Sequence, residues 1–90
     1  MNISKQEQRV LHVLAQGGAI HHLRVDGQLT SVDCFNRHGL RLSDCTLDVF
    51  KKLKRRGFIA SIDSGPYRIT RLGRESVRPQ LDNQLAARGR

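Results

Sequence analysis

Tryptophan is absent from this chain of 90 residues, which has one tyrosine, three phenylalanines and two cysteines. So few aromatic side chains give little support to the stacking platforms that hold single-stranded nucleic acids. Two cysteines do not make the disulfide framework of a small secreted protein. We therefore expect Cys34 and Cys45 to remain thiols in a reducing cytoplasm.

Long apolar runs are also missing. No stretch approaches the roughly 20 apolar residues that span a bilayer, and the segment Met1–Gln6 lacks the apolar core of a secretory signal. We expect a cytoplasmic protein without a membrane partner. A chain this short forms one domain with a small core, for which 38% hydrophobic residues suffice. It has no room for a cofactor fold beside a substrate domain, and we expect no cofactor.

Groupings that carry chemistry are lacking as well. The four histidines do not have the spacing of zinc ligands, and the adjacent His21 and His22 would point to opposite faces of a strand. The eight acidic residues form no evident pair, and no glycine-rich phosphate loop is present. We expect neither a metal site nor an enzyme.

Positive charge is abundant: 16 lysines and arginines against eight acidic residues give a net charge of +8. Such a balance attracts phosphate backbones or acidic proteins over long range. It does not decide between them, and a merely solvated or ribosome-associated basic surface has the same composition.

The first half of the chain predicts a helix and a hairpin. Ser4 and Glu7 have the spacing of a capping box, and Gly17-Gly18 ends the helix that follows. Asp26-Gly27 then joins two β-prone runs, residues 19–25 and 28–35. A strict two-residue turn would place Val32 on one face of the hairpin and Ile20 and Leu29 on the other. A bulged turn would change this arrangement, so the register stays open. Residues 40–42 could add a third strand.

The second half predicts a basic helix, a wing and a last helix. Ser43-Asp44 offers caps for a helix over residues 46–56 with Thr46, Val49, Phe50 and Leu53 on its apolar side, and Gly57 ends it. Two strands follow, over residues 58–62 and 67–70, joined by the turn at residues 63–66. Thr70 can cap a third helix from Arg71 that Pro79 interrupts.

This order of elements resembles the end of a winged-helix domain, in which a glycine-ended helix leads into a wing hairpin and a last helix. The fold class is therefore α+β: a winged-helix-like domain built of a helix, a β-hairpin or three-strand meander, a helix, a wing hairpin and a C-terminal helix. A standard winged helix has a further helix where this chain has the hairpin, which weakens a transfer of DNA recognition. We expect a single domain over residues 1–83 and a flexible tail over residues 84–90.

The candidate binding residues are basic side chains of the second and third helices and the wing. Five of them occupy the arc opposite the apolar side of the second helix. We expect that four of these can be exchanged without opening the core: Lys51, Lys52, Arg55 and Arg56. The arc could track phosphates or hold a protein partner, and it could also be a solvated face that suits the helix C-terminus. The complete set is Lys51, Lys52, Lys54, Arg55, Arg56, Arg68, Arg71, Arg74 and Arg78.

Four segments resemble, in order, the bacterial YjhX family. They are the opening from Ile3 to Gly18, the run Asp44-Cys45-Thr46-Leu47-Asp48-Val49-Phe50-Lys51, the strand Pro66-Tyr67-Arg68-Ile69, and Gln80-Leu81-Asp82-Asn83. The resemblance covers the chain from Met1 to about Asn83. It implies a toxin of a toxin–antitoxin pair that inhibits bacterial DNA topoisomerase I by protein binding, thereby interfering with the enzyme's use of DNA. An acetyltransferase-like antitoxin would counter it.

The resemblance transfers no functional residue, so the basic set above rests on physical grounds alone. The alternative function is a winged-helix, DNA-binding transcriptional regulator. The sequence does not decide whether the protein binds DNA directly.

Overall fold

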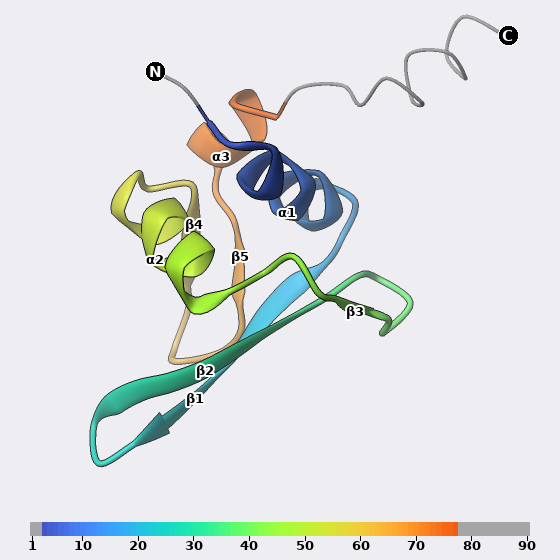
Figure 1. Cartoon of the computed structure of the whole chain (residues 1–90). Helices are drawn as coiled ribbons and strands as arrows, with labels where there is room; N and C mark the ends of the chain where they lie inside the picture. The colour runs from blue at the N-terminus through green and yellow to red at the C-terminus, as the bar shows by residue number, and fades with distance from the viewer. Residues whose placement is uncertain (1–2, 78–90) are drawn as a thin grey trace, which may run out of the picture.

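The computed structural model describes residues 3–77, which form three helices and one five-stranded antiparallel sheet (Figure 1). The spatial order of the strands is β3-β2-β1-β5-β4. This confirms the α+β class and is compatible with a winged-helix-like arrangement. The elements in chain order are α1 (Lys5–Ala15), β1 (Ala19–Val25), β2 (Gln28–Phe35), β3 (Arg41–Leu42), α2 (Leu47–Arg55), β4 (Ile59–Ser61), β5 (Tyr67–Ile69) and α3 (Arg71–Glu75).

Helix α1 begins at the predicted capping box. The Ser4 hydroxyl accepts a hydrogen bond from the Glu7 amide at 3.1 Å, and Glu7 Oε1 accepts one from the Ser4 amide at the same distance. The helix ends before Gly17, whose φ of 104° is favourable only for glycine. Both ends of the helix are therefore determined by local sequence.

The β1–β2 hairpin settles the register that the sequence left open. Asp26-Gly27 forms the two-residue turn, with φ values of 52° and 79° and Val25 opposite Gln28. A bulge between Leu23 and Arg24 shifts the pairing, so that Leu29 lies on the same face as Ile20 and Val32. That face is turned toward the helices. Leu23 and Val25 lie on the opposite face and are 57% and 51% exposed.

The start of α2 differs from the prediction. Thr46, not Ser43 or Asp44, is the cap, and its hydroxyl accepts from the Val49 amide at 3.2 Å. Thr46 is exposed and does not belong to the apolar side of the helix. At the other end, Gly57 (φ 77°) donates to Lys54 and the Phe58 amide to Leu53, the two hydrogen bonds of a Schellman motif.

The wing and α3 follow the prediction with shorter bounds. Thr70 caps α3, accepting from the Gly73 amide at 3.0 Å, and its hydroxyl also donates to the Gly57 carbonyl at 2.7 Å. A Cβ at Gly73 would meet the Phe58 carbonyl oxygen, so glycine lets α3 lie directly on the connection between α2 and β4. Helix α3 ends at Glu75, and Arg78, Pro79 and the predicted tail lie outside the described residues.

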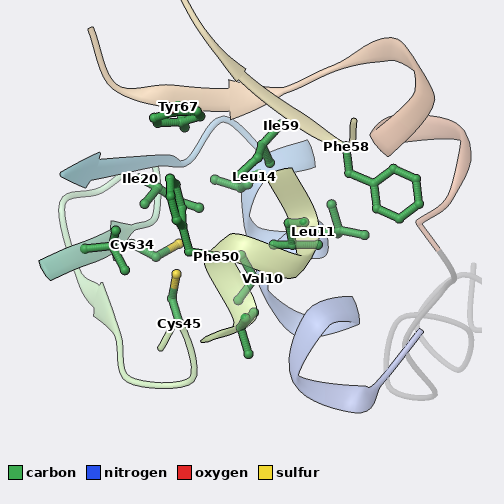
Figure 2. Packing of buried hydrophobic residues seen from close by; sticks show 13 residues of the cluster. Val10, Leu11, Leu14, Ile20, Cys34, Cys45, Phe50, Phe58, Ile59 and Tyr67 are labelled. Atoms are coloured by element: carbon green, nitrogen blue, oxygen red, sulfur yellow. The ribbon is translucent and has the colours of Figure 1, made fainter. Parts of the chain in front are cut away.

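The core lies between the helices and one face of the sheet (Figure 2). Helix α1 contributes Val10, Leu11 and Leu14, and α2 contributes Val49, Phe50 and Leu53. Phe50 meets the Tyr67 ring edge-on, with centroids 4.8 Å apart. The sheet and the segments beside it complete the cluster with Ile20, Val32, Cys34, Cys45, Phe58, Ile59 and Tyr67.

We expect Leu53→Ala to destabilise the domain strongly. Leu53 has no solvent-exposed surface, and truncation of a buried leucine costs roughly 2–5 kcal/mol. That is a large share of the stability of a small domain, about 5–15 kcal/mol. Urea unfolding followed by circular dichroism measures the change, with Leu40→Ala as control because Leu40 is 66% exposed. Equal midpoints for the two variants would contradict the packing described.

Candidate partner interface on helix α2

The exposed side of α2 is cationic, as the sequence predicted. Lys51, Lys52, Lys54 and Arg55 are exposed, whereas the apolar side of the helix is buried. Lys52 pairs with Asp48 at 3.2 Å, and Lys54 lies over the Tyr67 ring, 5.7 Å from its centroid. Lys51 and Arg55 have no polar partner among residues 3–77. These two cations are therefore available to another molecule.

Arg56 is different, because it is part of the structure of the domain. Its Nε lies 3.7 Å from Glu7 Oε2, and its side chain is only 24% exposed. The Glu7 side chain is 3% exposed, and within the described part of the chain its Oε2 accepts no hydrogen bond. Removing Arg56 would take the nearest positive charge from a buried carboxylate, which is costly. The expectation that four cations of this helix can be exchanged without opening the core is therefore wrong for Arg56.

The other predicted cations lie elsewhere. Arg68 points away from α2, because its neighbour Tyr67 contacts that helix and successive residues of a strand alternate. Arg71 pairs with Glu75 at 3.3 Å, and Arg74 donates to the Ala15 carbonyl at the C-terminus of α1 at 3.3 Å. With Arg78 outside the described residues, the structure brings together Lys52, Arg55 and Arg56 rather than the whole predicted set.

A hollow beside these three cations was not predicted from the sequence. It has an apolar part of about 490 Å³ and an adjoining polar part of about 370 Å³, which share Ile3 and Arg56. We call the two parts together the α2–α3 groove. The apolar part is lined by Ile3, Arg56, Phe58, Leu72, Glu75, Ser76 and Val77, and the polar part by Ile3, Ser4, Glu7, Lys52, Arg55 and Arg56.

The groove combines charge with apolar surface. Leu72 is 51% exposed at its apolar end, and Lys52 and Arg55 stand exposed at its polar end. Its walls come from the N-terminal segment, the end of α2 and α3, which are far apart in the sequence. In the sequence, only Leu72 hints at an apolar surface here, as an apolar residue among the cations of the third helix, and it does not reveal the groove.

Other kinds of site find no support in the described part of the chain. Residues 3–77 contain no group of three or more histidine, cysteine or acidic side chains that could hold a metal ion. No helix among them is long and apolar enough to cross a membrane. His22 packs edge-on against Tyr67, with ring centroids 5.3 Å apart, and is part of the packing under the wing.

Comparison of the sequence with known proteins identifies the family of this chain. Residues 1–84 match the model of the YjhX toxin family, described as "Putative toxin of bacterial toxin-antitoxin pair". The chain is 57% identical to a UPF0386 protein of Brucella anthropi over 84 residues, which are 93% of this chain and all of the relative. A UPF0386 protein of Beijerinckia indica is 60% identical over 85 residues, with coverage of 93% and 100%.

A third relative, the UPF0386 protein of Caulobacter vibrioides, is 57% identical over 89 residues, 98% of each chain. No solved structure matches the chain. A toxin of such a pair implies an antitoxin as a partner. With the family match spanning residues 1–84 and close relatives along nearly the whole length, the chain belongs to the YjhX toxin family.

Proposed function

We propose that this protein is a toxin that inhibits bacterial DNA topoisomerase I by binding it, without catalysis, through the α2–α3 groove and the adjoining cations of α2. The observation that carries the proposal is the continuity of apolar and cationic surface there. Leu72 lines the apolar part of the groove, and Lys52 and Arg55 line the polar part, which adjoins it at Ile3. Such a surface matches a protein segment that bears both apolar and acidic side chains.

Protein binding accounts for this combination better than phosphate binding does. Contacts to a nucleic-acid backbone need cations and hydrogen-bond donors, and an apolar groove adds nothing to them. Protein interfaces instead combine an apolar centre with a polar rim. The net charge of +8 would speed the encounter with an acidic partner. Inhibition would follow when the bound toxin obstructs the enzyme's use of DNA.

The antitoxin is the second partner. We propose an acetyltransferase-like protein in this role, as the family resemblance implies. An antitoxin that covers the same groove would exclude the enzyme by competition, and this requires no chemistry on the toxin.

A DNA-binding regulator is the second candidate function. The wing supports it, because Arg68 is exposed on β5, and a basic α2 in a winged-helix-like arrangement is suited to phosphates. Two observations weigh against it. Strands occupy the interval between α1 and α2, and Lys54 already contacts the Tyr67 ring.

Overproduction of the protein in a bacterial host should make plasmids more negatively supercoiled and slow growth. Topoisomerase I removes negative supercoils, so its inhibition leaves them in place. Topoisomer distributions on chloroquine gels measure the effect, and additional topoisomerase I should reverse it. An unchanged distribution at high protein levels would contradict inhibition of this enzyme.

Two pairs of charge variants test the surface. Lys52→Gln with Arg55→Gln removes two cations of the groove and keeps the helix propensity nearly constant. Arg24→Gln with Arg37→Gln removes two exposed cations elsewhere. We expect the groove pair to weaken binding to purified topoisomerase I at least about tenfold, or about 1.4 kcal/mol, and the control pair to weaken it far less. Equal losses would mean that net charge alone acts.

One apolar variant separates the two candidate functions. Leu72→Ser alters the apolar end of the groove, and Leu40→Ser alters an exposed leucine outside it. A protein partner should lose affinity with Leu72→Ser but not with Leu40→Ser, whereas duplex DNA should bind both variants alike. Duplex binding that needs Lys52 and Arg55 but is indifferent to Leu72, with no binding to topoisomerase I, would favour the regulator.

A further inference from the structure

The two cysteines meet inside the core, although they come from different segments. Cys34 lies on β2 and has no exposed surface, and Cys45 is 7% exposed in the connection between β3 and α2. Figure 2 shows their sulfur atoms pointing toward each other, beside Phe50 and Ile20. Both thiols are free, and they are hydrogen-bonded to each other.

The backbone holds the two residues in this arrangement. Cys34 pairs directly with Leu42 across the β2–β3 ladder, and the chain then turns at Ser43-Asp44 to reach Cys45. Arg9 of α1 holds Asp44 through an ion pair of 2.9 Å. Cys45 immediately precedes Thr46, the cap of α2. Strand pairing on one side and an ion pair on the other therefore keep the sulfurs together.

The surroundings make the two thiols unequal. The hydrogen bond from Cys45 lowers the pKa of Cys34, against the opposing effect of burial. The same hydrogen bond, burial and the nearby charges of Cys34 and Asp33 raise the pKa of Cys45. A thiolate is the attacking species in disulfide exchange. We therefore expect Cys34 to attack first and Cys45 to react second.

We propose that Cys34 and Cys45 form a reversible redox pair, which closes to an intramolecular disulfide when the protein meets a small-molecule disulfide such as oxidised glutathione. The proposal does not depend on the function proposed above. It rests on the convergence of two buried thiols that strand pairing and an ion pair hold in place.

The reaction balances in two exchanges. The Cys34 thiolate attacks one sulfur of oxidised glutathione, the glutathione S–S bond breaks, and one glutathione thiolate leaves and takes up a proton. The Cys45 sulfur, after losing its proton, then attacks Cys34 in the mixed disulfide and releases the second glutathione. Two protein thiols are oxidised, and one glutathione disulfide is reduced to two thiols. Because both sulfurs are buried, the first exchange needs a local opening that exposes the Cys34 sulfur to the glutathione disulfide.

The consequence concerns α2. A covalent link from β2 to the residue before the α2 cap would tie the start of the cationic helix to the sheet. It would also close a loop in the unfolded chain and so favour the folded state. Oxidation would thus stabilise the form of the domain that presents the α2–α3 groove.

The test is an equilibrium in glutathione buffers of known ratio. The full chain is incubated folded and, separately, in urea, and acid-quenched samples are analysed by mass spectrometry for the Cys34–Cys45 disulfide. We expect the equilibrium constant for closure to be at least roughly tenfold larger in the folded protein than in urea, because folding brings the sulfurs together. An equal or smaller constant in the folded protein would overturn the proposal.

Single variants identify the roles of the two thiols. Cys45→Ser should accumulate the mixed disulfide of Cys34 with glutathione, and Cys34→Ser that of Cys45, because neither variant can close the internal bond. Wild-type protein that forms disulfide-linked dimers instead of the internal bond would also contradict the proposal. The glutathione equilibrium uses the wild-type chain, so its outcome does not depend on whether either variant folds.

Discussion

The packing of one apolar stripe of α2 against the inner face of the sheet decides where the other parts of this chain can lie. Phe50 and Leu53 are fully buried, and Phe50 meets Tyr67 of β5 edge-on. Because this side of the nine-residue helix is buried in the core, its lysines and arginines must face outward. The same packing brings the connection between α2 and β4 beside α3, where Thr70 donates to the Gly57 carbonyl and Gly73 leaves room for the Phe58 carbonyl. The cationic face and the groove are both consequences of it.

A second constraint joins α2 to the beginning of the chain. Glu7 completes the capping box of α1 with one carboxylate oxygen and faces Arg56 with the other. One residue thus serves a local role and a long-range one. Arg56 in turn stands between the apolar and polar parts of the groove. The cation at the centre of the proposed interface therefore also contributes to the fold, so the peripheral Lys52 and Arg55 are the residues that report on binding.

Local signals in the sequence predicted most elements, and long-range packing explains the rest. The capping box, the Asp26-Gly27 turn and the Gly57 helix end each involve a few neighbouring residues, and the structure contains all three. The bulge at Leu23 was left open, because it depends on which face of the hairpin the helices cover. Thr46 replaced the predicted cap for the same kind of reason, since Cys45 must turn inward to the core. The groove could not be predicted, because its walls come from three separate segments.

Hydrogen–deuterium exchange of the toxin, free and mixed with purified topoisomerase I, tests the central claim most directly. We expect the enzyme to slow amide exchange at the C-terminal half of α2 and in α3, the backbone around the α2–α3 groove, and to leave the tip of the β1–β2 hairpin unchanged. The same segments should exchange at their free rates when duplex DNA is added instead of the enzyme. Protection confined to the hairpin, or produced by DNA alone, would contradict a protein-binding surface on α2.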